Sequence, residues 1–330
     1  MNHVRAIPIK LQSTVDASIN HVIQTQDGGF WESRWVQRDP SYGIIYVSSQ
    51  SGCDQSCRFC HLTATRQTQT TQATVEDFVL QARRVLESVQ ALVEQDAGWV
   101  KPEKIHINFM ARGEPLLNPE VVHPQTMLWD ALEQVVHEVL PGVLVYFKVS
   151  TIMPQTWWAW MKEKPHQVTL PLDPRVQLYY SLYSLNPQFR KRFVPKAMDP
   201  HLALDLLVQH QGRTGQEMVI HHALIQGQND DLHTIDAWLS AVQERGLRVK
   251  FNLVRYNPPH ASAGVETEED QLQLNFQHIQ HVLGHPDSRI VPRVGWDVKA
   301  SCGMFITPQI VSGQEDQERR EDQELKESNS

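Results

Sequence analysis

The 330-residue chain contains little cysteine: it has four, and three of them (Cys53, Cys57 and Cys60) fall within one short segment. A secreted disulfide framework spreads an even number of cysteines along a short chain, so this clustering favours a metal site. No apolar run approaches the ~18 residues of a membrane span, and the first residues lack the apolar segment of an export signal. We therefore expect a cytoplasmic protein without a membrane partner.

The net charge of −8 is distributed unevenly. Residues 313–330 hold seven acidic and three basic side chains, a net −4, so the remaining residues also carry only −4. This tail has almost no apolar side chains to offset the entropy of ordering, and we expect 313–330 to be a disordered acidic tail. The net negative charge of the remaining residues does not indicate nucleic-acid binding, although a local strip of basic residues can bind nucleic acid.

Runs of β-branched and aromatic residues alternate with amphipathic helical patterns, which predicts βα units and a parallel sheet. The pattern alone leaves open a full barrel, a partial barrel or a flat doubly wound sheet. In each of these folds the chemistry lies at the carboxyl ends of the strands. The predicted strands are Ile44–Ser48, Lys104–Phe109, Leu144–Ser150, Val176–Leu182, Glu217–Leu224, Arg248–Val254 and Ser288–Arg293. The predicted helices are Val75–Glu94, Thr126–Val139, His201–Gln211, Leu232–Arg245 and Glu268–Leu283.

The three clustered cysteines follow the first predicted strand with the spacing C-x3-C-x2-C. A short loop with this spacing can turn three thiolates toward one [4Fe–4S] cubane and leave the fourth iron without a protein ligand. That iron can chelate the amino and carboxylate groups of S-adenosylmethionine. The alternative is zinc, which normally requires four ligands; only His61 and the distant Cys302 could complete such a set.

With its surroundings, this motif resembles the RlmN/Cfr group of radical enzymes, which methylate adenosine carbons in RNA. The resemblance covers roughly 32–303 in the family's order. Its most specific parts are the Gly113–Asn118 block (Gly-Glu-Pro-Leu-Leu-Asn) and the late Cys302-Gly303 pair. It also includes Ser150-Thr151, Ser181–Tyr183 with Asn186, Val194-Pro195, Asn229-Asp230, Asn252-Leu253 and Asn257-Pro258.

The resemblance implies a partial (β/α)6-type radical S-adenosylmethionine barrel at 43–312, preceded by a short N-terminal extension at 1–42. It implies a [4Fe–4S] cluster on Cys53, Cys57 and Cys60, S-adenosylmethionine as cofactor, a flavodoxin-type electron donor and an RNA substrate. The residues that would contact the cofactor are Gly113, Glu114, Ser150, Ser181, Leu182, Tyr183 and Asn257. Glu114 could accept hydrogen bonds from the methionine ammonium, or it could be an ordinary solvated loop carboxylate.

Two further residues receive catalytic roles from the resemblance. In the family, the cysteine that matches Cys302 takes a methyl group from one cofactor molecule; a 5′-deoxyadenosyl radical from a second then abstracts hydrogen, and the methylene radical attacks the adenine carbon. The alternative for Cys302 is a small buried apolar residue. Glu32 matches, more loosely, a glutamate that removes the proton from the attacked carbon.

The sequence departs from the family at Tyr46, where a second catalytic cysteine releases the methylated RNA. Once three ligands and Cys302 are assigned, no cysteine remains for that role. An external thiol could resolve the adduct, the later chemistry could differ, or methylation could be lost. Basic candidates for RNA contact are Arg190–Arg192 and Lys196. The rival functions are a radical enzyme with a non-RNA substrate and a non-catalytic RNA-binding relic.

Overall fold

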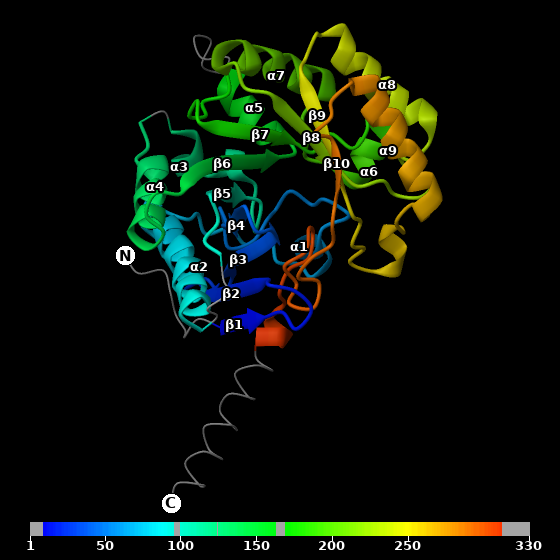
Figure 1. Cartoon of the computed structure of the whole chain (residues 1–330). Helices are drawn as coiled ribbons and strands as arrows, with labels where there is room; N and C mark the ends of the chain where they lie inside the picture. The colour runs from blue at the N-terminus through cyan, green and yellow to red at the C-terminus, as the bar shows by residue number, and fades with distance from the viewer. Residues whose placement is uncertain (1–8, 96–99, 124, 163–168, 312–330) are drawn as a thin grey trace, which may run out of the picture.

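The computed structural model describes residues 9–95, 100–123, 125–162 and 169–311. Its centre is one curved sheet whose ten strands are hydrogen-bonded in sequence order, from β1 at one edge to β10 at the other (Figure 1). The strands are β1 (Ile9–Gln12), β2 (Ile19–Gln24), β3 (Phe30–Asp39), β4 (Tyr42–Tyr46), β5 (Lys104–Phe109), β6 (Leu144–Thr151), β7 (Val176–Tyr180), β8 (Met218–His222), β9 (Val249–Val254) and β10 (Arg289–Val291).

Strands β4 to β10 are all parallel, whereas β1 to β4 pair antiparallel. Parallel strands such as β5 (Lys-Ile-His-Ile-Asn-Phe) and β9 (Val-Lys-Phe-Asn-Leu-Val) alternate, because apolar side chains on one face pack in the main core while Asn108 and Asn252 on the other line a cavity. The predicted α/β fold with a parallel, partial-barrel sheet is therefore confirmed. Residues 9–39 of the predicted N-terminal extension add three strands to the same sheet, which the sequence reasoning missed; a domain boundary at 42/43 stays a prediction.

Helices cover the outer face of the sheet and the connecting loops gather on the other side (Figure 1). The described helices are α1 (His61–Ala64), α2 (Val75–Gln95), α3 (Pro119–Val122), α4 (Leu128–Val139), α5 (Gln155–Lys162), α6 (Pro187–Phe193), α7 (Pro200–Thr214), α8 (Leu232–Glu244) and α9 (Glu269–Leu283), with short 3-10 turns at Pro115–Leu117 and Ala261–Ala263. The five predicted helices are present, and α1, α3, α5 and α6 were not predicted.

Helix α2 begins as its sequence predicts. The Thr74 hydroxyl lies 3.0 Å from Asp77 Oδ2, and Asp77 also accepts a hydrogen bond from the Thr74 amide. In return, the Asp77 amide donates to the Thr74 hydroxyl oxygen (3.3 Å), which satisfies a donor that the first turn of a helix leaves without a partner. The buried stripe that includes Phe78, Val85 and Val89 then packs into the main core. The cap and the stripe together fix the helix against the strands that precede the cysteine loop.

The segment after β10 returns to the first strands and bridges the two edges of the sheet. Asp297 accepts hydrogen bonds from the Ser13 hydroxyl and the Thr14 amide, and the Val298 carbonyl accepts one from Asn20. Further along, Ile306 packs in a small apolar cluster with side chains of β1 to β3. These contacts hold residues 297–306 across the open side of the barrel.

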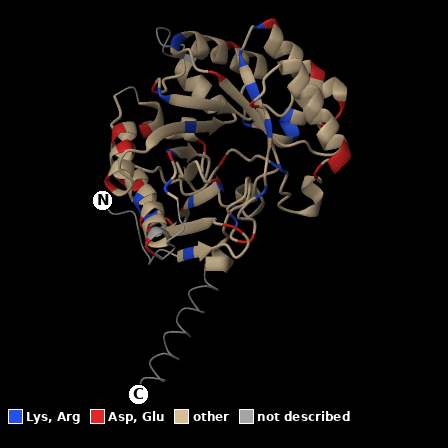
Figure 2. Cartoon of the chain, viewed as in Figure 1, with Lys and Arg blue, Asp and Glu red and all other residues tan. Residues whose placement is uncertain are grey.

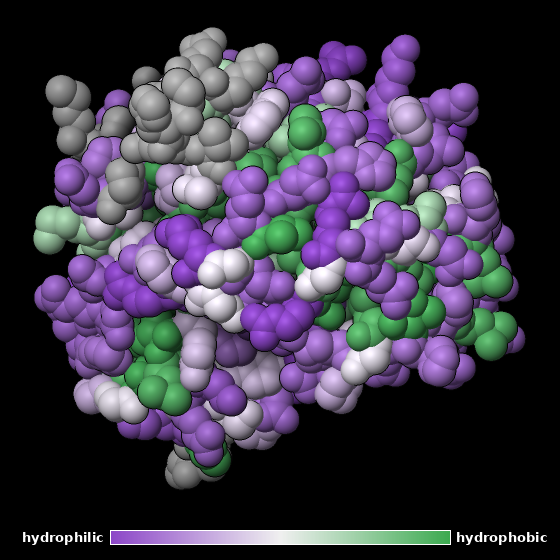
Figure 3. All heavy atoms as spheres, turned by 90° about the horizontal axis from the view of Figure 1, so that it is seen from above, coloured by the Kyte–Doolittle hydropathy of each residue, from purple (hydrophilic) through white to green (hydrophobic). Residues whose placement is uncertain are grey.

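The described part of the chain contains no helix long and apolar enough to cross a membrane. The face in Figure 3 is largely hydrophilic, with its apolar side chains in scattered groups. The predicted disordered tail at 313–330 lies outside the described residues. Cytoplasmic location stays a prediction.

Candidate active site in the central cavity

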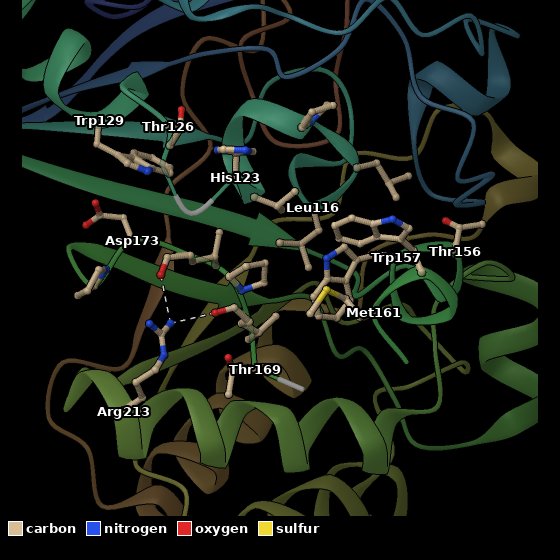
Figure 4. A pocket seen from close by; sticks show the side chains of 18 residues that line it. Leu116, His123, Thr126, Trp129, Thr156, Trp157, Met161, Thr169, Asp173 and Arg213 are labelled. Atoms are coloured by element: carbon tan, nitrogen blue, oxygen red, sulfur yellow. Dashed lines mark hydrogen bonds between the residues drawn. The ribbon is translucent and has the colours of Figure 1, made fainter. Parts of the chain in front are cut away.

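Two cavities stand out in the described structure, and they differ in chemistry. The larger, about 900 Å³, lies between α3, α4, α5 and α7 and is mainly apolar (Figure 4). The Arg213 guanidinium there donates hydrogen bonds to the carbonyl oxygens of Leu170 and Leu172. The smaller cavity, about 230 Å³, lies inside the barrel and is lined by all four cysteines, Glu114 and several strand-end polar residues. Both cavities contain titratable side chains, but all four thiols line the second one together with a buried carboxylate, which makes it the candidate active site.

The cysteine loop follows β4 and is fixed mainly by backbone hydrogen bonds. The Cys53 amide donates to the Gln67 carbonyl (3.0 Å), and the Cys60 amide donates to the Cys57 carbonyl (3.1 Å). Ser56, between the first two cysteines, has a φ of 59°, a left-handed conformation that non-glycine residues seldom adopt. Phe59 stacks on Tyr183 with ring centroids 4.3 Å apart. The loop is thus held in a conformation that directs its thiols into the cavity.

Burial raises the pKa of all three loop thiols, and each of Cys53 and Cys57 is raised further by the neighbouring cysteines. The three sulfurs therefore lie close enough to repel one another as thiolates, in surroundings that keep them protonated until a metal replaces the protons. Three cysteine ligands leave one iron of a [4Fe–4S] cubane open, and the three thiols of this loop are the candidates for that set. No set of three or more His, Cys, Asp or Glu side chains is placed for a single metal ion within the described ranges.

Glu114 follows β5 and is 4% exposed. Its carboxylate accepts hydrogen bonds from the Leu116 amide (3.2 Å) and the Ile152 amide (3.1 Å). Burial raises its pKa to about 7, although the Thr151 hydroxyl and these two amides act in the opposite direction. Gly113 before it has a φ of +97°, and a Cβ there would lie 2.5 Å from Ser49 Oγ. Glu114 is a buried carboxylate, not a solvated one, and no cation pairs with it among the described residues.

Ser150 and Ser181, at the ends of β6 and β7, meet at one histidine. Their hydroxyls lie 2.5 Å and 2.9 Å from His221 Nε2, and burial lowers the pKa of His221 to about 4. Tyr183 lines the cavity with a φ of 60°. Leu182 does not: its side chain is fully buried in the main core, so only its backbone could face the cavity.

Cys302 enters the cavity from the segment that closes the barrel. Its carbonyl accepts a hydrogen bond from Asn257 Nδ2 (2.8 Å), and the next carbonyl, that of Gly303, accepts one from the His61 amide (3.2 Å). Cys302 is accessible to solvent and is not the small buried residue of the alternative interpretation. Its surroundings still raise the thiol pKa, while Arg34 and Arg38 act to lower it. Asn257 therefore positions Cys302 in this structure through its amide nitrogen.

Glu32 lies behind the cavity wall, on β3. Its carboxylate is fully buried and pairs with Arg112 Nε (2.7 Å) and Arg34 Nη2 (2.8 Å). Asn20 and the Ile306 amide also donate to it. Burial by itself would raise its pKa, but the two arginines hold the pKa below its usual value. Every oxygen of Glu32 is thus engaged, and it does not line the cavity, so the geometry favours a structural role over proton abstraction.

The predicted RNA-contact residues are not equivalent. Arg190 is 7% exposed, and its guanidinium donates to the carbonyls of Leu182, Ser184 and Met198. It fixes the loop after β7 and cannot reach a phosphate. Lys191 and Arg192 are exposed, and Lys196 Nζ lies 3.3 Å from Asp54. A contact with RNA at those three positions stays a prediction.

Several cavity residues were missed by sequence reasoning: Arg34, Arg38, Lys148, His221 and Arg289. They lie within strands, where a polar side chain in an apolar run is the available signal. Lys148 in the run Leu144–Thr151 is the clearest case, since an interior lysine contradicts the composition expected of a buried parallel strand.

Comparison with known proteins found no matching family model. The chain is 24% identical to the dual-specificity RNA methyltransferase RlmN of Helicobacter hepaticus, over 90% of this chain and 77% of that protein. It is 25% identical to the probable RlmN of Koribacter versatilis, over 91% of this chain and 83% of that protein. With the probable RlmN of a Synechococcus strain the identity is 29%, over 74% and 62%.

Among solved structures, a radical SAM methyltransferase from Sphaerobacter thermophilus matches with a TM-score of 0.67 and 21% identity. The match covers 90% of this chain and 80% of that one. The match shows that this chain shares the fold of that protein.

Proposed function

We propose that this chain, which is a divergent relative of the RlmN proteins, is a radical S-adenosylmethionine enzyme that methylates an adenosine carbon of RNA. A [4Fe–4S] cluster with S-adenosylmethionine, when bound, supplies the radical that removes hydrogen from an unreactive carbon. The proposal rests on one observation above all: Cys302 shares a single small cavity with Cys53, Cys57, Cys60 and Glu114. A flavodoxin-type protein would donate the electron.

In this proposal Cys53, Cys57 and Cys60 hold the cluster. Glu114 receives the ammonium group of the cofactor, because a buried carboxylate without a cation gains most from a charged donor. Ser150 and Ser181 offer hydroxyls from the next two strands, held in place by the neutral His221. Gly113 lets the backbone approach closely.

Cys302 carries the methyl group. Asn257 and the first turn after the cysteine loop hold the Cys302–Gly303 turn beside the cluster ligands, so the carrier sulfur and the cofactor lie in the same enclosed space. Burial raises the pKa of the Cys302 thiol, and Arg34 and Arg38 act against this rise, toward the thiolate that accepts a methyl group. Glu32 keeps Arg34 and Arg112 in position rather than abstracting a proton.

Tyr46 lines the cavity with its hydroxyl 3.2 Å from Arg38 Nη2. This position faces the site where a resolving thiol would act, and a phenol cannot form a disulfide. We therefore propose that release of the methylated product depends on an external thiol. The same residue favours the second candidate function, a radical S-adenosylmethionine enzyme that acts on a substrate other than RNA.

The test is transfer of a labelled methyl group. Protein reconstituted anaerobically is incubated with reductant and methyl-labelled S-adenosylmethionine, and its peptides are read by mass spectrometry. We expect label on Cys302, and none in Cys302→Ala, which should retain about four irons per chain. Cluster-replete protein without label on Cys302 would contradict the carrier role. A second measurement compares the methyladenosine content of RNA from cells with and without the protein. If Cys302 is labelled but the methyladenosine content is the same in both, the non-RNA substrate is favoured.

A further inference from the structure

The central cavity has a second feature that the cofactor residues do not account for: an excess of positive charge. Its lining holds five basic side chains and only one carboxylate, that of Glu114; the basic residues are Arg34, Arg38, Lys148, Arg255 and Arg289. By contrast, the outer helices α4, α8 and α9 carry acidic residues (Figure 2). The charge of the cavity is therefore opposite to that of the molecule as a whole.

Two of the five cations are neutralised by protein carboxylates. Arg34 pairs with Glu32, and Arg255 lies 2.7 Å from Glu269. Arg38, Lys148 and Arg289 have no carboxylate within 4.0 Å among the residues that the structure describes. Three unpaired cations that face one enclosed space repel one another, an arrangement that is unfavourable without an anion.

Among these three cations, the charge of Lys148 is the most costly to bury, because its side chain lies in the middle of β6 and is only 9% exposed. Its ammonium lies 2.8 Å from His106 Nδ1 and 5.8 Å from the ring centre of Tyr179. Neither neighbour carries a negative charge at neutral pH. Burial lowers the pKa of Lys148 to about 7, and the positive charges of Arg289 and Lys250 act in the same direction. A bound anion would raise this pKa again and keep the ammonium charged, so a lysine at this place indicates an anionic ligand.

Two groups of strand neighbours line this part of the cavity, which we call the cationic level. Tyr46, Asn108 and Lys148 are direct neighbours across β4, β5 and β6, and Asn252 is the neighbour of Arg289 across β9 and β10. At this level Arg38 Nε, Asn108 Oδ1 and Asn252 Oδ1 are buried without a hydrogen-bond partner. Buried polar atoms are normally satisfied, so the unpartnered groups mark a place for a polar ligand.

This level is electrostatically distinct from the thiol end of the cavity. The cationic neighbours that act on Cys302 are Arg34 and Arg38, whereas those that act most on Lys148 are Arg289, Lys250 and Arg38. Arg38 acts on both groups, and its guanidinium donates a hydrogen bond to the Tyr46 hydroxyl, next to Asn108 and Lys148 in the strand register.

We propose that Arg38, Lys148 and Arg289 form a binding site for a phosphate-type oxyanion inside the barrel. Guanidinium and ammonium groups are the side chains that bind such an anion most strongly, and the carboxamides of Asn108 and Asn252 can donate to it in the flipped orientation. The oxyanion belongs either to a phosphodiester of RNA or to a free phosphomonoester. The site does not depend on methylation by Cys302, and it is tested by binding alone.

The test measures affinity in the full-length chain by calorimetry, with adenosine 5′-monophosphate, adenosine and a short single-stranded RNA as probes. Lys148→Met should weaken binding of a phosphate-bearing probe by about tenfold or more and change adenosine binding less than about twofold. The matched control is Lys101→Met, because Lys101 is exposed and contacts only the Pro141 carbonyl. For the RNA, the slope of log K against log salt should also fall by about one.

The possible outcomes distinguish the two sources of the oxyanion. An effect on the monophosphate alone assigns a free phosphomonoester, and an effect on the RNA assigns a phosphodiester. Equal losses in Lys148→Met and Lys101→Met, equal losses for adenosine and its monophosphate, or no binding of either phosphate probe to the wild type would overturn the proposal. Should Lys148→Met not fold, Arg289→Met replaces it, since Arg289 is exposed at the start of its strand and its loss leaves no buried cavity.

Discussion

Two fully buried glutamates lie on opposite sides of the same cavity wall and behave in opposite ways. Behind the wall, Glu32 is held by Arg34 and Arg112, and its pKa is below the usual value. In front of it, Glu114 accepts hydrogen bonds from uncharged donors only, and burial raises its pKa to about 7. The protein supplies cations for the first carboxylate, and we propose that a ligand supplies the cation for the second. A buried carboxylate that is paired with protein cations has a structural role, and one without such a cation indicates a binding site.

The comparison predicts its largest effect on stability at Glu32. Glu32→Gln would leave two buried guanidiniums without their counterion, and removing one partner of a buried pair costs ~3–5 kcal/mol. We expect a marked fall in melting temperature, measured by calorimetry. The matched control is Glu138→Gln, because Glu138 is exposed and pairs with Arg83 at the surface; its cost should be below about 1 kcal/mol. Equal effects of the two substitutions would contradict the distinction.

At Glu114 the prediction concerns cofactor affinity instead. Glu114→Gln keeps the shape of the side chain and removes the charge that we assign to the cofactor ammonium. Affinity for S-adenosylmethionine should fall by about tenfold or more in cluster-loaded protein, while the melting temperature of the ligand-free protein stays equal or rises. Glu120→Gln, on the neighbouring helix α3 and outside the cavity lining, should bind like the wild type. A large loss of stability in Glu114→Gln would indicate that Glu114 has a structural role and does not bind a ligand.

The smallest predicted effect is on pH dependence, again in protein without its cofactors. The folded-state pKa of Glu114 is raised to about 7, so between the unfolded value near ~4.5 and 7 the folded state binds more protons. The contribution of this group to stability therefore decreases as pH rises through that window. The melting-temperature difference between Glu114→Gln and wild type should grow from pH 5 to pH 7.5 and then level off. A difference that shrinks with pH would mean that a cation pairs with Glu114.

Sequence reasoning located the parallel strands and the five long helices because their apolar periodicity is a local signal. It missed β1 to β3, whose polar residues Asn20, Glu32 and Arg34 look exposed but are buried by pairing with one another and with Arg112. The cysteine loop, Glu114 and Cys302 were found from motifs. The cationic level was not, since it depends on strands distant in sequence bringing Lys148 and Arg289 into the lining of one cavity.

The sequence order of the ten strands has a consequence for the emerging chain. Every new strand finds its neighbour already present at the sheet edge, so the barrel can grow in the direction of synthesis. The cysteine loop is then complete more than two hundred residues before Cys302 leaves the ribosome. Iron that binds the three loop thiols at that stage would meet no competition from Cys302, because Cys302 has not yet been synthesised.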